Sequence, residues 1–237
     1  MLALDAIGTA AIASLNSFRR WQTGDFETEV RKRTVEEAQV NPMWDERYQG
    51  DDYVYGTSAN DFLQSQVDRL PMGRILCLAE GEGRNAVFLA ERGFDVTAVD
   101  QSSVGLAKAH KLATERGVDI TTVVADLADF HIEPEAWDGV VSIFAHMPAP
   151  ARRHLHREVV SGLRSGGVFL LEAYRPEQLQ YGTGGPPTAE LMMDLKGLRA
   201  ELAGLDFDYA VDTVRDIHEG RLHSGQGAVV QVLAHKP

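Results

Sequence analysis

Strand-like and helix-like segments alternate along the chain from Arg74 onward, and this alternation limits the fold more than any other feature. Segments rich in helix-forming residues separate most of the strand-like runs, and consecutive parallel strands need such crossovers. We therefore predict an α/β fold with a parallel sheet and helices on both faces. The expected strands are RILCLA (74–79), DVTAVD (95–100), DITTVVAD (119–126), WDGVVSIF (137–144) and GGVFLLEAY (166–174).

The two ends of the chain depart from this alternation. After a Gly- and Pro-containing loop at 175–187, we expect one helix over 188–202, then two strand-like pieces at 207–220 and 227–236 joined by a turn. At the other end, an Ala-rich start leads into a charge-dense stretch without a clear apolar stripe. We therefore expect residues 1–42 to be an N-terminal extension of helix-forming composition and residues 43–237 to be a single domain.

Composition excludes several classes of function. The 237 residues include 35 acidic and 23 basic ones, a net charge of −12, and no basic patch is visible, so we expect no nucleic-acid partner. One cysteine, Cys77, excludes an intrachain disulfide and a cysteine-rich zinc site, and the scattered histidines show no metal-ligand spacing. No apolar run approaches the roughly 18 residues of a membrane span. Because no basic residue precedes Arg19, the start does not match a secretory signal either, and we expect a cytoplasmic protein that acts on a small molecule.

A glycine-containing turn follows the first predicted strand. Gly81-Glu82-Gly83-Arg84-Asn85-Ala86 fits the pattern G-x-G-x-x-G/A, in which glycines let the backbone turn tightly and approach a ligand. Asp100 stands at the end of the second predicted strand, 20 residues beyond Glu80, where a carboxylate can accept both hydroxyls of a ribose. The alternative is an ordinary glycine turn followed by a helix-capping aspartate.

The charge of the turn distinguishes between nucleoside cofactors. Glu80 and Glu82 oppose only Arg84, with Asp100 nearby, so the local field favours a cation over a pyrophosphate. Repulsion between a carboxylate and a phosphate, about 1–4 kcal/mol per close pair, is enough to disfavour a dinucleotide cofactor. This favours S-adenosylmethionine, which carries an ammonium and a sulfonium but no phosphate. An NAD(P)-dependent oxidoreductase and a non-catalytic S-adenosylmethionine-binding module remain as alternatives.

Four stretches in order resemble the motifs of class I S-adenosylmethionine-dependent methyltransferases: ILCLAEGEGRNAVFLAERG (75–93), AVDQS (98–102), VVADLADF (123–130) and WDGVVSIF. This resemblance implies a Rossmann-like three-layer sandwich, with a mostly parallel seven-stranded sheet and an antiparallel C-terminal strand. The GEGRNA core, the Trp-Asp-x-x-Tyr…Tyr-x-Tyr-Gly segment from Trp44 to Gly56, and DIHEGRLHSGQGAVVQVLAHK (216–236) are similar to the tellurite-resistance and thiopurine-type branch. The similarity runs from about Met43 to the C-terminus.

The resemblance assigns a set of cofactor-binding residues. The turn should contact the methionine moiety, Asp100 the ribose, Asp126 and Leu127 the adenine, and Phe144 the sulfonium region. Leu127 and Phe144 could equally be core residues, and Asp126 could cap a turn. The full set is Tyr55, Glu80, Gly81, Glu82, Gly83, Arg84, Asn85, Asp100, Gln101, Ser102, Asp126, Leu127 and Phe144.

The acceptor is expected to be a small, soft nucleophile: a thiol, a thiopurine or a chalcogen oxyanion such as tellurite or selenite. Because the cofactor is already activated, the protein mainly supplies proximity and alignment. Candidate catalytic residues are Arg175 and His146, which follow predicted strands, and His218. Both His218 and His223 lie near the predicted terminal turn, and the resemblance favours His218. Related proteins often have a basic residue beside that histidine, where this chain has Glu219.

Overall fold

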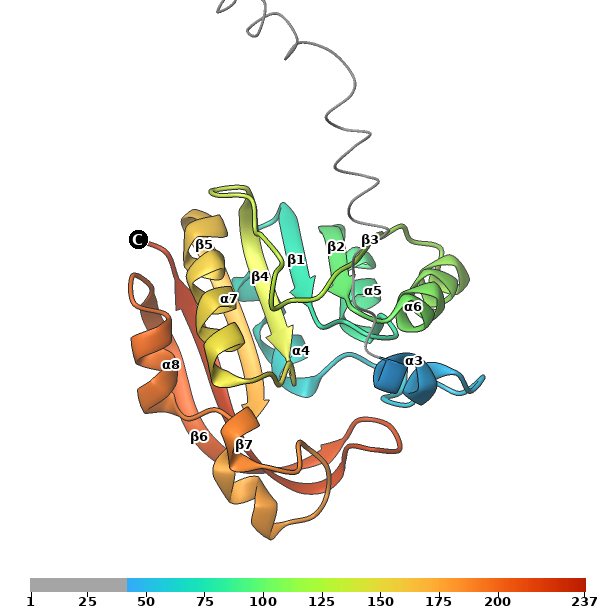
Figure 1. Cartoon of the computed structure of the whole chain (residues 1–237). Helices are drawn as coiled ribbons and strands as arrows, with labels where there is room; N and C mark the ends of the chain where they lie inside the picture. The colour runs from blue at the N-terminus through green and yellow to red at the C-terminus, as the bar shows by residue number, and fades with distance from the viewer. Residues whose placement is uncertain (1–41) are drawn as a thin grey trace, which may run out of the picture. The chain divides into compact units, whose positions relative to one another are not determined.

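A computed structural model describes residues 42–237; the expected extension at 1–42 lies outside the described residues except for Pro42. The described chain contains one seven-stranded sheet in the order β3-β2-β1-β4-β5-β7-β6 (Figure 1). The strands are β1 (Arg74–Leu78), β2 (Asp95–Asp100), β3 (Thr121–Val124), β4 (Trp137–Ile143), β5 (Leu163–Tyr174), β6 (Asp206–His218) and β7 (Ser224–His235). The first five are parallel, and β7 pairs antiparallel with both β5 and β6, so the predicted sheet is confirmed.

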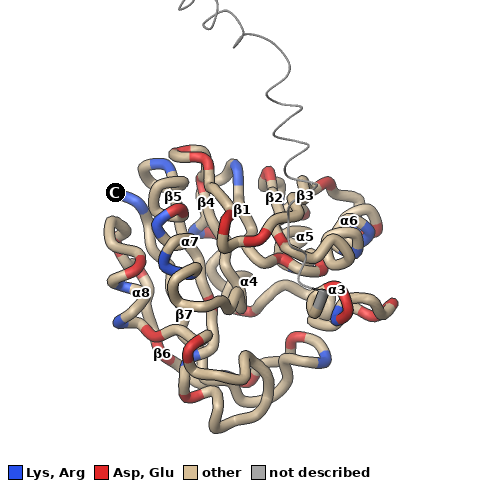
Figure 2. The backbone as a smooth tube through the Cα atoms, in the orientation of Figure 1, with Lys and Arg blue, Asp and Glu red and all other residues tan. Residues whose placement is uncertain are grey.

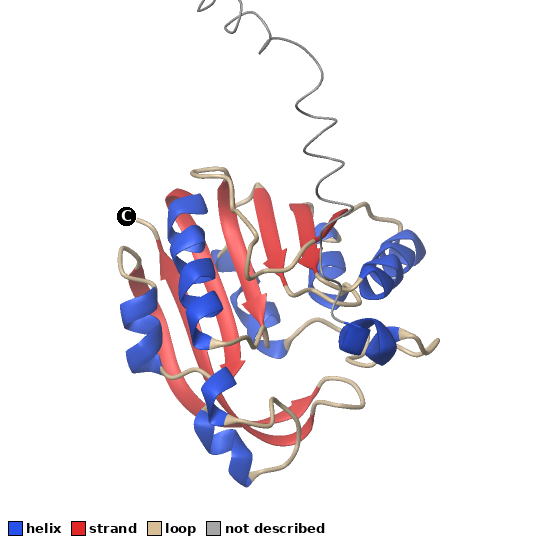
Figure 3. Cartoon of the chain, in the orientation of Figure 1, coloured by secondary structure: helices blue, strands red, loops and turns tan. Residues whose placement is uncertain are grey.

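Helices cover both faces of the sheet, which makes three layers (Figure 3). Alternation along β1 divides the core: Ile75 and Cys77 face one cluster, whereas Leu76 and Leu78 face the other. Helices α4, α5 and α6 pack on the first face, and α7 and α8 pack on the second. The α-helices are α3 (Pro42–Tyr48), α4 (Asp61–Gln66), α5 (Arg84–Ala90), α6 (Ser103–Arg116), α7 (Ala149–Gly162) and α8 (Leu195–Glu201), and short 3-10 helices cover Val67–Arg69, Pro176–Gln180 and Ala189–Leu191.

The single helix expected over 188–202 is wrong. The segment forms a 3-10 turn at Ala189–Leu191 and then, after extended residues, α8. Asp194 causes the second start, because its side chain accepts a hydrogen bond from Gly197 N and caps α8. Tertiary pairing explains the extended residues, since Met193 N donates to the carbonyl of Tyr174.

The strand order places a switch point between β1 and β4. The chain leaves β1 toward β2 and β3 on one side, then returns to build β4 and β5 on the other. In open α/β sheets, ligands bind outside the carboxyl ends of the strands at such a point. Acidic residues gather where β1 and β2 end, beside α5 (Figure 2). Among the described residues, no helix has the length and apolar character that a membrane span requires.

Candidate active site

Two glycines shape the turn between β1 and α5. Gly81 and Gly83 have left-handed backbones, with φ of +59° and +92°. A Cβ at Gly81 would lie 2.6 Å from the Tyr48 hydroxyl, and one at Gly83 would lie 2.5 Å from the Cβ of Ala109 on α6. The turn therefore needs glycine twice, for its conformation and for the close approach of α3 and α6.

Two buried carboxylates lie beneath this turn, and both accept backbone hydrogen bonds. Glu80 Oε1 accepts from Asn85 N and Ala86 N, each at 2.8 Å, and so caps α5. Asp100 Oδ2 accepts from Gly81 N, and Oδ1 accepts from Ser102 N, also at 2.8 Å. Burial raises the pKa of Glu80 to about 7 and also raises that of Asp100. No lysine or arginine of residues 42–237 forms an ion pair with either, so an incoming cation would be favoured here.

Glu82 fastens the segment before the sheet onto the turn. Its Oε2 accepts from Val54 N at 2.7 Å and from Tyr55 N at 3.4 Å, and its Oε1 lies 2.5 Å from Lys108 Nζ. Lys108, on α6, also donates to the carbonyls of Tyr48, Gly50 and Asp52. Through these contacts Glu82 holds residues 48–55 over the turn, and its expected contact with the cofactor stays a prediction.

Arg84 belongs to a buried network of compensated charges. Its Nη2 lies 2.6 Å from Glu219 Oε2, and Glu219 also pairs with Arg215 at 2.5 Å. Arg215 in turn binds Glu172 at 2.7 Å, while Asn60 Nδ2 donates to both glutamates. Although burial opposes ionisation, Arg84 and Arg215 hold the pKa of Glu219 below its ordinary value. The positive charges of the two arginines are thus balanced by the negative charges of the two glutamates.

Aromatic rings gather at the carboxyl ends of β4 and β5. Phe144 has a left-handed backbone at φ +52°, and its ring centroid lies 4.6 Å from that of Tyr174 and 4.7 Å from that of His223. Tyr55 lies 4.6 Å from His223, and His146 stacks on Tyr174 at 5.7 Å. We call Tyr55, Phe144, His146, Tyr174 and His223 the ring cluster. It combines residues from the loop before α4, the loop after β4, β5 and the β6–β7 turn.

His146 is a member of the ring cluster with both nitrogens occupied. A carbonyl only accepts, so Nδ1–H donates to Leu191 O at 3.1 Å, and Nε2 then accepts from Tyr174 N at 3.3 Å. Burial lowers the pKa of His146 to about 4. In this arrangement the imidazole is neutral and links the 189–193 loop to β5, with no nitrogen free for a substrate.

The other candidates from the sequence lie in different surroundings. The His218 side chain is 73% exposed and pairs with Asp216, and Arg175 pairs with Glu177 and Asp212.

Asn85 Oδ1 accepts from Asn60 N, Asp126 Oδ1 accepts from Ala128 N as a turn cap, and Leu127 is buried in the second core cluster. Ser102 caps α6 and donates to Asp45, while Gln101 beside it is half-buried. Sequence reasoning gave His223 less weight than His218, and only β-strand alternation on a known register could have separated the two.

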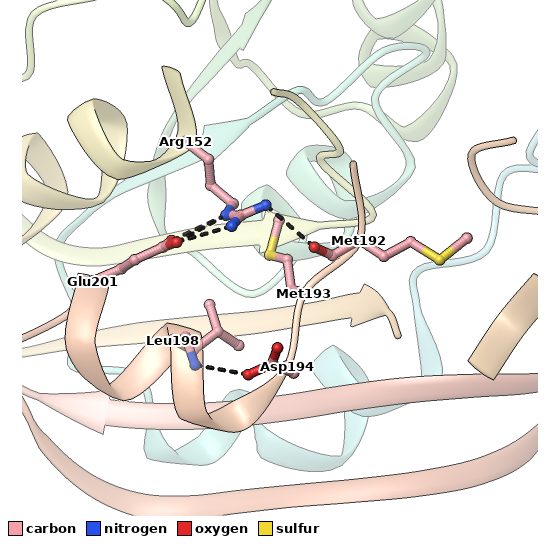
Figure 4. A pocket seen from close by; sticks show the side chains of 7 residues that line it. Arg152, Met192, Met193, Asp194, Leu198 and Glu201 are labelled. Atoms are coloured by element: carbon pink, nitrogen blue, oxygen red, sulfur yellow. Dashed lines mark hydrogen bonds and ion pairs between the residues drawn. The ribbon is translucent and has the colours of Figure 1, made fainter. Parts of the chain in front are cut away.

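Two small cavities lie among the described residues. One, of about 30 Å³, lies between α7 and α8, where Arg152 binds Glu201 and the carbonyl of Met192 (Figure 4). This cavity can hold about one water, which is too small for a substrate. The contacts of Arg152 around it hold α7 against α8. The other, of about 110 Å³, is lined by Tyr55, Gly56, Thr57, Ser58, Ala59, Asp61, His218, Glu219 and Gly220.

Comparisons with known proteins agree with this geometry. Residues 75–167 match the family model described as a methyltransferase domain. A glycine/sarcosine N-methyltransferase of Halorhodospira halochloris is 33% identical over 120 residues, which cover 48% of this chain and 45% of that protein. The chain thus spans about half the length of the glycine/sarcosine N-methyltransferases that it matches.

Solved structures share the fold at low identity. A protein that converts a disulfide bond into a thioacetal group during echinomycin biosynthesis has a TM-score of 0.69 at 17% identity, covering 84% of this chain and 92% of that one. TehB from Haemophilus influenzae has a TM-score of 0.62 at 18% identity, with 82% and 66% covered. At such identities the likeness shows the fold alone.

Proposed function

We propose that this chain, whose residues 75–167 match the methyltransferase-domain model, is an S-adenosylmethionine-dependent methyltransferase that transfers a methyl group to a small molecule. The main support comes from two buried carboxylates. Glu80 and Asp100 are buried carboxylates without a cationic partner among the described residues, and they lie beneath a glycine turn at the switch point of the sheet. An ammonium and a sulfonium would supply the missing positive charge.

The residues present fit S-adenosylmethionine. Each Asp100 oxygen accepts one backbone N–H and keeps a second lone pair for a ribose hydroxyl. The edge of the ring cluster lies beside the turn, because Tyr48 contacts both Gly81 and Tyr55, and aromatic faces attract cations. We propose that Tyr55 and Phe144 flank the sulfonium and that Asp126 and Leu127 hold the adenine. When bound, S-adenosylmethionine supplies an electrophilic methyl group for in-line displacement.

The charge of the site bears on the acceptor. Arg84, which is buried, and Arg215, which is half-buried, act on His223 of the ring cluster and are neutralised by Glu219 and Glu172. A tellurite or selenite anion would find no free buried cation among these residues, whereas a neutral thiol would need none. Within the class of small, soft nucleophiles we therefore favour thiols. Membership of the tellurite-resistance and thiopurine-type branch is supported by the motifs alone.

Calorimetric titration and a turnover screen test the proposal. We expect S-adenosylmethionine and S-adenosylhomocysteine to bind and NADH not to bind. The screen measures S-adenosylhomocysteine release with aromatic thiols, thiopurines, tellurite, selenite, glycine and sarcosine. Binding of NADH in preference to S-adenosylmethionine would favour the oxidoreductase alternative, and binding without turnover on every acceptor would favour a non-catalytic module.

A further inference from the structure

Two buried polar atoms of the ring cluster have no hydrogen-bond partner: Tyr174 Oη and His223 Nδ1. The Tyr174 side chain is fully buried and that of His223 is 8% exposed. Two other buried polar atoms of the described chain are unbonded, but Glu82 Oε1 is in an ion pair with Lys108, and Trp137 lies at the opposite end of β4. Since buried polar groups are normally paired, two unpaired ones in one cluster are candidate contacts for a ligand.

The two rings that carry these atoms lie close to each other and near the cofactor turn. The rings of Tyr174 and His223 are perpendicular with centroids 5.4 Å apart, and each contacts Phe144. His223 also contacts Tyr55, whose backbone N–H is bound by Glu82 of the turn. A ligand bonded to both polar atoms would therefore lie beside the place where the sulfonium is expected.

The surroundings of these atoms favour an uncharged ligand. Burial lowers the pKa of His223 to about 3, and nearby Arg84 acts in the same direction, so the imidazole is neutral at physiological pH. Burial likewise raises the pKa of Tyr174, which keeps its proton. The charged groups on the neighbouring elements cancel in two Arg–Glu pairs, Arg84–Glu219 and Arg215–Glu172.

We propose that Tyr174 Oη and His223 Nδ1 bind the S–H group of a neutral thiol acceptor, and that His223 Nδ1 takes its proton during transfer. This assignment rests on the methyltransferase function proposed above. It gives the proton-accepting role to His223, in the β6–β7 turn, and not to the exposed His218, five residues earlier at the end of β6, or to His146, whose nitrogens are occupied.

The step balances in atoms and charge. The acceptor sulfur forms the new bond to the methyl carbon, the bond from that carbon to the sulfonium sulfur breaks, and its electron pair stays on that sulfur. The thiol proton passes to His223 Nδ1. One positive charge, on sulfur, disappears as another appears on the imidazole, so the buried site holds the same total charge before and after. This offsets the burial that otherwise opposes protonation of His223.

Two thiols that differ in ionisation separate proton transfer from simple positioning. Benzyl mercaptan is protonated near neutral pH, whereas 4-nitrothiophenol is already a thiolate. We expect His223→Asn, which keeps a polar group without a basic nitrogen, to lower kcat/KM about 100-fold for benzyl mercaptan and less than about 5-fold for 4-nitrothiophenol. Exposed His110→Asn on α6 is the matched control.

A second variant measures binding without turnover. Tyr174→Phe removes only the hydroxyl, and we expect it to weaken benzyl mercaptan binding to the S-adenosylhomocysteine-saturated protein about 5- to 10-fold by calorimetry. Tyr209→Phe, whose hydroxyl donates to Gln231 outside the cluster, is its control. Melting curves and S-adenosylmethionine affinity show that each variant is folded, and His223→Gln replaces His223→Asn if the latter is not.

Each outcome has one meaning. Equal losses with both thiols, or no loss, overturn proton transfer to His223, and unchanged thiol binding in Tyr174→Phe overturns the contact to Tyr174. If the unmodified protein methylates neither thiol yet releases S-adenosylhomocysteine with another acceptor of the screen, this inference fails and the proposed function stands. If S-adenosylmethionine does not bind at all, the proposed function itself fails.

Discussion

Asp100 combines a structural and a ligand-binding role in one carboxylate. Its two oxygens accept hydrogen bonds from Gly81 N and Ser102 N. These bonds fix the turn after β1 and the start of α6 relative to β2. In our proposal the same oxygens also accept hydrogen bonds from the ribose hydroxyls. Removing the side chain should therefore affect both affinity and stability, and replacing it with an amide should affect both less.

We expect Asp100→Ala to weaken S-adenosylmethionine binding about 30- to 1000-fold, because hydrogen bonds to a charged group contribute roughly 1.5–3 kcal/mol each and water recovers part. The unfolding free energy should fall by about 1–3 kcal/mol, since two buried N–H groups lose their acceptor. Asp100→Asn should lower both the affinity and the unfolding free energy by less, and Asp119→Ala, at an exposed position, should change neither. Calorimetric titration and urea denaturation measure these changes; unchanged affinity in Asp100→Ala would place the ribose elsewhere.

Glu80 should make stability depend on pH. Burial raises its pKa in the folded protein from 4.5 to about 7, so between these values the folded state holds a proton that the unfolded state has released. The free energy of unfolding should therefore fall as pH rises from about 4.5 to 7, by on the order of 3 kcal/mol from this group. Glu80→Gln removes the titration but keeps an oxygen that caps α5.

Urea denaturation at pH 5.0 and 8.0, without ligand, tests this expectation. The stability lost between these two pH values should be smaller in Glu80→Gln than in the unmodified protein or in Glu133→Gln, an exposed control. Equal losses in all three proteins would show that Glu80 is ionised, or protonated, across the whole range.

At the scale of elements, α6 holds the short segment at 42–56 over the glycine turn. The contact rests on Lys108, whose ammonium bonds three backbone carbonyls of that segment and the Glu82 carboxylate. Asp45 of α3 adds a second attachment by accepting from Ser102 Oγ. Without these polar contacts α3, seven residues long, would have little to stabilise it.

Lys108→Met keeps the apolar stem and removes the charge. We expect it to lower the unfolding free energy by about 3 kcal/mol, because Glu82 loses its cation in a buried position, and to weaken S-adenosylmethionine binding at least about 10-fold as Tyr48 and Tyr55 are released. Lys111→Met, on the exposed side of the same helix, should change stability by less than about 0.5 kcal/mol. Equal effects of the two variants in denaturation and calorimetry would refute the attachment.

At the scale of the whole molecule, every motif assigned to the cofactor lies after residue 42. A chain beginning at Met43 keeps α3 from its second residue and all seven strands. We expect it to fold and to bind S-adenosylmethionine within a few-fold of the full chain. Calorimetry on both chains provides the comparison, and a loss of more than about tenfold would show that residues 1–42 contribute to the site.

Features that depend on neighbours along the chain were predictable from the sequence alone. Strand and helix alternation, the glycine turn, the Ser102 cap of α6 and its stop at Gly117 follow from backbone conformation and side-chain periodicity within a few residues. The split of the expected helix at 188–202 depended on Met193 pairing with Tyr174, 19 residues away, and was missed.

The partners of the polar side chains were decided only by the tertiary structure. Arg84 forms an ion pair with Glu219, and Asn85 accepts a hydrogen bond from Asn60 N. His223 packs in the ring cluster, whereas His218 is exposed. The Arg84–Glu219 pair and the two histidine positions depend on the register of β6 and β7, and all of these contacts depend on the sheet topology that brings distant segments to one edge. A local sequence pattern shows which side chains are able to form hydrogen bonds or ion pairs. Because these interactions act over a few ångströms in space, the actual partners are set only when the whole sheet has assembled.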